Sequence, residues 1–300
     1  MHGLLPRVEP PVPGRFSSTD PAALDGRFPR VGAARFGPPW LRAKRWSYAA
    51  VVSPLAFCGV TLADATYACQ ATVWVFDRKR HDLACRTWLT PPVLAVRVPE
   101  HPIRDDAVFR WPGAAAAIRH HGAACPREIR AEISVDGRPV ELFVSVQAER
   151  ARVEPVQYAG RLDPGWQFTH KAMGIPVEGF VRIGTRRLPL SGGFLLADYS
   201  HGLMPRRVAW WWAAGAGTDD RGRIVAFNLV SGFNDAEGGE NTTWIDLAGG
   251  QLGRSGLAPP GPPRALAAEP LAPFIAPPRP RRRRRPCLPR PPWRRPPASA

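Results

Sequence analysis

Short runs of β-branched and aromatic residues alternate with turn-forming or charged residues through the first half of the chain. These runs cover residues 46–52, 55–63, 66–76, 85–89 and 108–111. Such segments suit a pleated, half-buried surface, and their length is typical of strands. The pattern therefore predicts a series of neighbouring antiparallel strands.

The clearest hairpin lies on either side of Asp136 and Gly137. Residues 128–135 alternate charged or polar side chains with apolar or small ones, so one face of this segment meets water and the other a core. A second β-rich run ends at residue 146. Because Asp-Gly tolerates the positive φ of a tight two-residue turn, the two runs are predicted to pair directly.

Further strand patterns follow a turn-rich link at residues 153–165. They cover residues 166–171, 177–183 and 186–190, and a last hairpin has a tryptophan-rich strand at 207–214 and a turn at 218–223. No segment keeps a helical period of apolar residues for three turns. The alanine run at 114–117 is too short to nucleate a helix alone, and one helical turn is predicted near residues 21–24.

The fold class predicted from these patterns is all-β. About a dozen or more strands exceed a comfortable single sheet, which predicts two packed sheets or barrels. The composition divides the chain into a Pro- and Arg-rich lead-in, a first β domain, a second β domain and a tail, at residues 1–40, 41–152, 153–246 and 247–300.

The C-terminal tail differs from the rest of the chain in composition. Residues 251–300 contain eleven arginines, one acidic residue and fifteen prolines. Such a segment buries too little apolar surface to offset the entropy of ordering, which predicts disorder. Proline, arginine, alanine and glycine are also what GC-rich codons give out of frame, which favours a frameshifted or mis-called gene end as the origin of the tail.

The tail also carries most of the formal charge. The net charge of the 300 residues is +16 and that of the tail is +10, which leaves +6 for the first 250 residues. A nucleic-acid partner would rest on the arginine run at 281–285 alone. Because a charge run of this kind is usually just solvated, no specific nucleic-acid partner is expected.

Several classes of chemistry are excluded. The five cysteines are Cys58, Cys69, Cys85, Cys125 and Cys287. They form no CxxC pair, which predicts buried free thiols. The adjacent His120 and His121 would point to opposite faces of a strand, so they could not bind one metal ion together with Cys125. No phosphate-binding, dinucleotide or nucleophile-elbow motif occurs, so no cofactor and no metal is expected. Without a signal peptide or transmembrane segment, a cytoplasmic protein is predicted.

Asp198 and His201 are the catalytic candidates. They lie in a polar break between an apolar run and the tryptophan-rich strand. A carboxylate beside an imidazole can fix its tautomer and raise its pKa, which suits acid-base catalysis. Residues of these types in a Gly-flanked loop also often cap backbone groups, and that alternative stays open.

The ligand-binding candidates lie on the strands that follow. They are Trp210, Trp212, Phe227, Asn228, Glu240 and Asn241. By alternation, Trp210 and Trp212 share one face of a strand, which packs in a core or lines a ligand space. Trp211 points the other way. A buried Asn228 amide is satisfied either by a neighbouring strand or by a ligand. Lys171 lies opposite His170 on its strand and is expected at the surface.

Three blocks, in their order and spacing over residues 37–246, carry a family resemblance. They are residues 44–78, the WQFTHK segment at 166–171, and the stretch 190–246 with ADYSHG, the tryptophan-rich strand and ENTTWID. Together they resemble the bacterial family catalogued as domain of unknown function 2804. That family is similar to calycin-like proteins that include carotenoid hydratases, which implies two tandem lipocalin-like antiparallel β-barrels or sandwiches. Family members continue past ENTTWID with further strands, which implies an incomplete second barrel here.

Three functional hypotheses follow. The first is a binding module that holds a lipid, isoprenoid or other apolar small molecule between its sheets. The second is a cofactor-independent hydratase or isomerase in which Asp198 or His201 is the general acid for an unsaturated apolar substrate. The third is a non-functional truncated product. The sequence leaves the ligand and the oligomeric state open.

Overall fold

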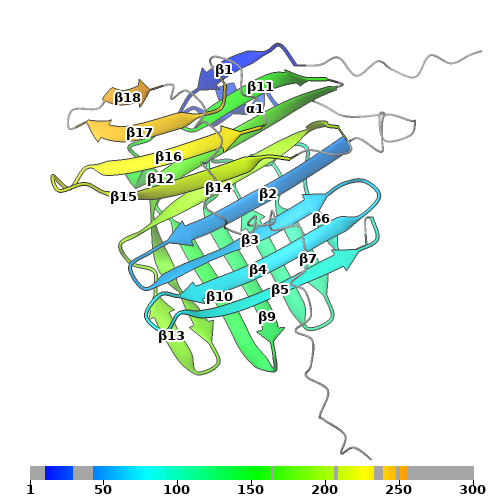
Figure 1. The fold of residues 1–300 in the computed structure, drawn as a ribbon, viewed down its shortest axis with the longest axis vertical. Coiled ribbons are helices and arrows are strands. Elements are labelled where there is room, and N and C mark those ends of the chain that lie inside the picture. The colour runs from blue at the N-terminus through cyan, green and yellow to red at the C-terminus, as the bar shows by residue number, and fades with distance from the viewer. Residues whose placement is uncertain are drawn as a thin grey trace, which may run out of the picture. The chain divides into compact units, whose positions relative to one another are not determined.

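The computed structural model describes most of the chain up to residue 255. The described residues are 11–29, 43–92, 94–163, 165–205, 209–232, 239–247 and 251–255. They all belong to one compact unit, residues 1–268, and their regular secondary structure is almost entirely strand (Figure 1). The predicted all-β fold class is confirmed. The disordered or frameshifted tail was predicted over residues 247–300, of which residues 248–250 and 256–300 lie outside the described residues.

In the described part of the chain, the strands form two antiparallel sheets, of fourteen and four strands. The large sheet contains β1 (Gly14–Ser17), β2 (Ala43–Val52), β3 (Ala56–Asp64), β4 (Cys69–Asp77), β5 (Asp82–Thr90), β6 (Val96–Arg97), β7 (Ala107–Trp111), β8 (Ala114–Arg119), β9 (Glu128–Val135), β10 (Arg138–Val146), β11 (Val156–Leu162), β12 (Gly165–Ile183), β13 (Arg186–Pro189) and β14 (Gly193–Leu203). The small sheet contains β15 (Trp211–Thr218), β16 (Ile224–Ser231), β17 (Thr242–Leu247) and β18 (Gln251–Ser255). Among the described residues, helix is confined to α1 (Pro21–Asp25) and the 3-10 turn η3 (Ala148–Arg150).

Strands from both halves of the chain are neighbours in the large sheet. Its main path runs β5-β4-β3-β2-β14-β12-β10-β9-β8-β7-β6, so β2 pairs with β14, and β12 joins β14 to β10. The predicted division into two domains near residue 152 stays a prediction. In the small sheet, β18 pairs with β17 and extends the strands beyond Asp246, where the sequence pattern was expected to end.

Local turn chemistry accounts for the hairpin between β9 and β10. Asp136 and Gly137 have φ angles of 50° and 76°, as the Asp-Gly pair predicted, and the two strands pair in register from Val135 and Arg138 outward. The alanine run at 114–117 is not helical but forms most of β8, which pairs with β7 and β9. Neighbouring strands therefore override the helical preference of alanine.

The sequence predicted two strands where β12 is one continuous strand of 19 residues. Its register against β14 shifts between Met173 and Ile175, and Gly174 between them has a φ of 76°. A β-bulge of this kind bends the strand without ending it. The first half of β12 pairs with β11, and the second half pairs with β10.

The bulge is also where the small sheet meets the large one. A Cβ atom added to Gly174 would lie 2.9 Å from the Cβ of Ala226 and 3.2 Å from Cγ2 of Ile224, both on β16. Ala226 and Trp244 are buried in the same core as the large sheet. The two sheets therefore share one apolar interior, and β15 and β16 pack on β12 (Figure 1).

Gly174→Ala tests this contact. A methyl group at a positive φ costs about 1–2 kcal/mol by itself, and overpacking against β16 adds about 1–3 kcal/mol. Gly122→Ala is the matched control, because Gly122 has a φ of 74° and a Cβ there would have open space. We expect urea denaturation to show a larger loss of unfolding free energy for Gly174→Ala. Equal losses would show that the small sheet does not press on the bulge.

Candidate functional site

Lys171 is buried at the junction of the two sheets, which corrects its predicted surface position. Its side chain is 4% exposed. The ammonium Nζ lies 2.9 Å from Oδ1 of Asp198 and 2.9 Å from Oε2 of Glu240. Alternation along β12 was predicted correctly, since His170 and Lys171 lie on opposite faces. The error arose because the face that carries Lys171 is covered by the small sheet.

Asp198 is held by four donors. It is the cross-strand partner of Lys171 in the register of β14 against β12. Its Oδ1 accepts hydrogen bonds from Lys171, from Thr169 Oγ1 at 3.0 Å and from Ser200 Oγ at 3.2 Å. Its Oδ2 accepts one from Trp46 Nε1 at 2.9 Å. Every donor except Trp46 lies on β12 or β14, so the large sheet itself fixes the carboxylate.

Glu240 brings a second carboxylate from the small sheet. It lies just before β17, and its side chain is 3% exposed. Its backbone carbonyl accepts hydrogen bonds from Asn228 Nδ2 at 3.0 Å and Thr242 Oγ1 at 3.0 Å. The ion pair with Lys171 therefore connects the two sheets through side chains that are almost fully buried.

Lys171 and Asp198 keep each other charged. Burial alone would lower the pKa of Lys171, but the charges of Asp198 and Glu240 outweigh it and raise that pKa. Burial alone would raise the pKa of Asp198, but the Lys171 charge and the hydrogen bonds from Trp46, Lys171 and Thr169 outweigh it and lower that pKa. At neutral pH the site therefore contains an ammonium ion and an ionised Asp198.

Aromatic rings surround this charged group. The Lys171 ammonium lies 5.9 Å from the centre of the Trp212 ring, and the Tyr48 ring meets Trp212 edge-on at 5.1 Å. Trp46, which donates to Asp198, stacks with Trp210 at 6.5 Å between ring centres. We call Lys171, Asp198, Glu240 and the rings of Trp46, Tyr48 and Trp212 the Lys171 site.

The predicted ligand-binding residues fall into two groups. Asn228 is fully buried, and its Oδ1 accepts from Trp212 Nε1 at 2.7 Å, so neighbouring residues satisfy its amide. Asn241 pairs with the backbone of Val230 through both ends of its amide and extends the sheet ladder. Phe227 is half-buried and lies over Gly215 on β15, away from Lys171. The structure thus brings Trp212, Asn228, Glu240 and Asn241 together, with Trp210 beside them.

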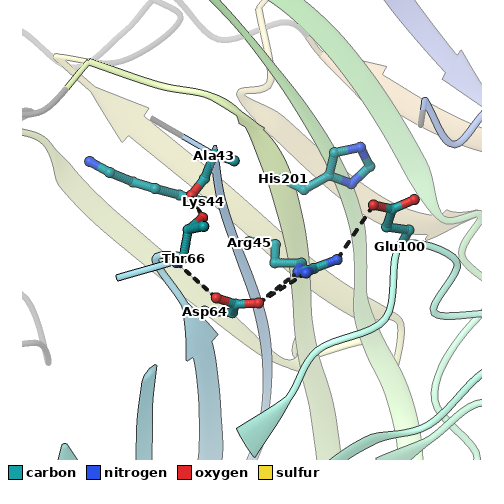
Figure 2. Close-up of a pocket in the computed structure, with 7 residues that line it drawn as sticks. All are labelled: Ala43, Lys44, Arg45, Asp64, Thr66, Glu100 and His201. Atoms are coloured by element: carbon teal, nitrogen blue, oxygen red, sulfur yellow. Dashed lines mark hydrogen bonds and ion pairs between the residues drawn. The ribbon is translucent and has the colours of Figure 1, made fainter. Parts of the chain in front are cut away.

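Asp198 and His201 do not form a pair. They are three residues apart on β14, so their side chains lie on opposite faces of the sheet. His201 is 1% exposed, and its Nδ1 lies 3.0 Å from the hydroxyl of Tyr199. It lines a small pocket with Arg45, Asp64 and Glu100 rather than the Lys171 site (Figure 2). Spacing along the strand was the signal that could have separated the two.

Burial also lowers the pKa values of the histidines on that face, so that their rings are neutral. It lowers the pKa of His201 to about 3, against the opposing effect of the Pro29 carbonyl, and the Arg45 and His101 charges lower it further. Burial lowers the pKa of His170 to about 4 and that of His120 to about 3. All three rings are therefore neutral at pH 7.

The remaining predicted features are placed as follows. Cys58, Cys69 and Cys125 are buried free thiols, as predicted, Cys85 is half-buried, and Cys287 lies outside the described residues. No three histidine, cysteine or acidic side chains in the described ranges are arranged to hold a metal ion. Within the same ranges, no helix has the length and apolar character to cross a bilayer.

Comparison with known proteins places the sequence in a family. The profile of the family described as Domain of unknown function (DUF2804) matches residues 26–253. The curated proteins contain no match. A solved AttH protein from Nitrosomonas europaea is similar at 12% identity and a TM-score of 0.42, covering 71% of this chain and 68% of that chain. CghA, in two crystal structures, is similar at 13% identity and a TM-score of 0.38, covering 81% of this chain and 66% of that chain.

Lys171→Met tests the buried ion group. Removing the ammonium takes the counter-charge from the buried Asp198 carboxylate and one ionic partner from Glu240, which typically costs about 3–5 kcal/mol of unfolding free energy. The loss should shrink as the pH falls, because burial raises the pKa of the Asp198 carboxyl once Lys171 no longer opposes it, and protonation then removes the uncompensated charge. Chemical denaturation between pH 3 and 8 measures both effects. Lys79→Met, which removes an exposed lysine, is the control, and equal stabilities of the two variants would contradict the assignment.

The buried histidines predict a loss of stability in acid. Since their folded-state pKa values lie below the unfolded value of about 6.5, their contribution is complete above pH 6.5 and is lost as the pH falls toward 3. His120→Asn should reduce the slope of unfolding free energy by about 1.4 kcal/mol per pH unit between pH 4 and 5.5. His81→Asn, at an exposed site whose φ of 53° suits asparagine, should keep the wild-type slope.

Proposed function

The chain belongs to the family of domains of unknown function DUF2804, and from its Lys171 site we propose that it binds an apolar small molecule. The proposed ligand is of the lipid or isoprenoid class and carries one oxygen atom. It lies against the aromatic rings at the junction of the two sheets, and Lys171 donates a hydrogen bond to its oxygen.

The donor capacity of Lys171 is the observation that carries this proposal. An ammonium group has three protons. Two are accounted for by Asp198 and Glu240, each at 2.9 Å. The ammonium also faces the Trp212 ring at 5.9 Å. A buried charge is costly, and perturbed, desolvated charges gather at functional sites more often than elsewhere.

The aromatic rings supply the apolar side of the proposed site. Trp46, Tyr48 and Trp212 come from β2 and from β15, on the two sheets that meet here. Tryptophan and tyrosine offer large rigid surfaces at a low cost in side-chain entropy, which suits contact with an apolar molecule. A carbonyl, carboxylate or hydroxyl oxygen on the ligand would meet Lys171 while its hydrocarbon part covers the rings.

The alternative function is a cofactor-independent hydratase or isomerase with Asp198 or His201 as the acid. The pKa directions argue against those two residues, because Asp198 is ionised and His201 is unprotonated at neutral pH. Lys171 carries protons, but its raised pKa makes it a weak acid and suits it better to stabilising negative charge on a bound oxygen. Binding is therefore the better-supported function.

Fluorescence titration with oleate, farnesol and hexadecane tests the proposal. The first two carry an oxygen and should quench tryptophan emission saturably, whereas hexadecane offers Lys171 no acceptor and should bind more weakly. Trp212→Leu should weaken the binding of oleate about tenfold, which corresponds to about 1.4 kcal/mol. Melting curves check that each variant folds.

Trp211→Leu is the matched control. Trp211 is the neighbouring residue on β15 and is 50% exposed, so it points away from the site. Its loss should leave the affinity for oleate and farnesol unchanged. Folded protein that binds neither compound, or equal effects of the two tryptophan substitutions, would overturn the proposal.

A further inference from the structure

Asn228 connects the aromatic part of the Lys171 site to its acidic part. It lies on β16 and is fully buried. Its Oδ1 accepts a hydrogen bond from Nε1 of Trp212 at 2.7 Å, and its Nδ2 donates one to the backbone carbonyl of Glu240 at 3.0 Å. One amide group therefore contacts both the residue that supplies the ring beside Lys171 and the residue that supplies the second carboxylate.

The two partners of this amide allow only one orientation. An indole N–H can only donate a hydrogen bond, and a backbone carbonyl oxygen can only accept one. If the oxygen and nitrogen of the Asn228 amide were exchanged, two N–H groups would face each other at Trp212 and two oxygens would face each other at Glu240. The roles of donor and acceptor are thus settled by the partners themselves.

The Trp212 ring takes its position from this hydrogen bond. Trp212 lies on β15, which is the edge strand of the small sheet in the described part of the chain. A tryptophan side chain turns about two torsion angles, so a bond to its Nε1 selects one direction of the ring. In that direction the ring lies 5.9 Å from the Lys171 ammonium and meets the Tyr48 ring edge-on.

Thr242 holds the same backbone carbonyl and offers a comparison. Its Oγ1 donates to the carbonyl of Glu240 at 3.0 Å, and the residue is fully buried. A carbonyl oxygen has two lone pairs, so it accepts from Thr242 and from Asn228 together. The Thr242 hydroxyl has one proton and spends it on this carbonyl. The bond that holds the indole of Trp212 comes from Asn228.

We propose that Asn228 is a positioning residue for ligand binding, because its amide holds the Trp212 ring where the apolar part of the ligand lies. The inference rests on the proposed binding of an apolar molecule at the Lys171 site. Asn228 acts through the ring and does not touch the ligand, since it is fully buried and its amide is bonded to Trp212 and Glu240.

Asn228→Leu and Thr242→Val are matched substitutions. Each replaces a fully buried polar side chain by an apolar one of similar shape and removes a donor to the Glu240 carbonyl. Asn228→Leu also removes the acceptor of the indole N–H of Trp212. Both should lower the melting temperature, because each leaves buried polar groups with fewer partners. They should differ in what happens to the ring.

The indole N–H signal of Trp212 reports the position of the ring without any ligand. It is identified in ¹⁵N NMR spectra by its loss in Trp212→Leu. Because an indole proton moves upfield when its hydrogen bond is lost, we expect an upfield shift in Asn228→Leu. Thr242→Val should keep the wild-type signal. An unchanged signal in folded Asn228→Leu would show that the amide does not hold the ring, and would overturn the inference.

Titration with oleate measures the consequence for binding. Asn228→Leu should weaken the affinity about fivefold, as the loss of one net hydrogen bond predicts, and Thr242→Val should keep the wild-type affinity. Equal weakening in both variants would indicate a general loss of structure and contradict a positioning role. If Asn228→Leu does not fold, Trp212→Phe breaks the same bond from the other side, and an unchanged affinity in that variant would be just as contrary.

The same titrations separate this inference from the proposed function. If wild-type protein binds oleate and Asn228→Leu binds it equally well although its indole signal has moved, the role of Asn228 is wrong and the proposed binding stands. If wild-type protein binds neither oleate nor farnesol, both are wrong.

Discussion

The position of one charge, the ammonium of Lys171, constrains the junction between the sheets. A charge this deeply buried is tolerated only with partners, because desolvation of an ion costs several kcal/mol. Asp198 comes from the adjacent strand of the same sheet, and Glu240 comes from the other sheet. The small sheet therefore cannot move away from β12 without breaking the ion pair between Glu240 and Lys171. Apolar packing around Ala226 also holds the two sheets together. The ion pairs, however, require one particular position of the small sheet on the large one.

The long strand β12 makes this placement possible. Its first half carries Lys171 between β11 and β14, and its second half crosses to pair with β10. The bulge at Gly174 lies three residues after the lysine and gives β16 room to approach. Bulges re-aim side chains where a sheet bends, and they occur often beside functional sites. One glycine thus serves both the bend of the strand and the contact between sheets.

The sequence predicts those features that depend on neighbours along the chain. The Asp136-Gly137 turn and most strands follow from local pattern, and so does the alternation that separates His170 from Lys171. Burial of Lys171 could not be predicted, because the sheet that covers it begins only at Trp211, forty residues further along the chain. The pairing of Asp198 with His201 was a different kind of error. Two side chains three residues apart on a strand point to opposite faces, so the spacing already argued against it.

Asp198 and His201 are both buried, on opposite faces of β14, but their neighbours give them different charges. Asp198 is ionised because the Lys171 charge and the hydrogen bonds from Trp46, Lys171 and Thr169 compensate its desolvation. His201 is neutral because burial lowers its pKa and the positive charge of Arg45 lowers it further. The same strand consequently separates a face with a buried ion pair from a face with a buried neutral imidazole. Since neither Asp198 nor His201 exchanges a proton readily near pH 7, neither is suited to acid-base catalysis at that pH.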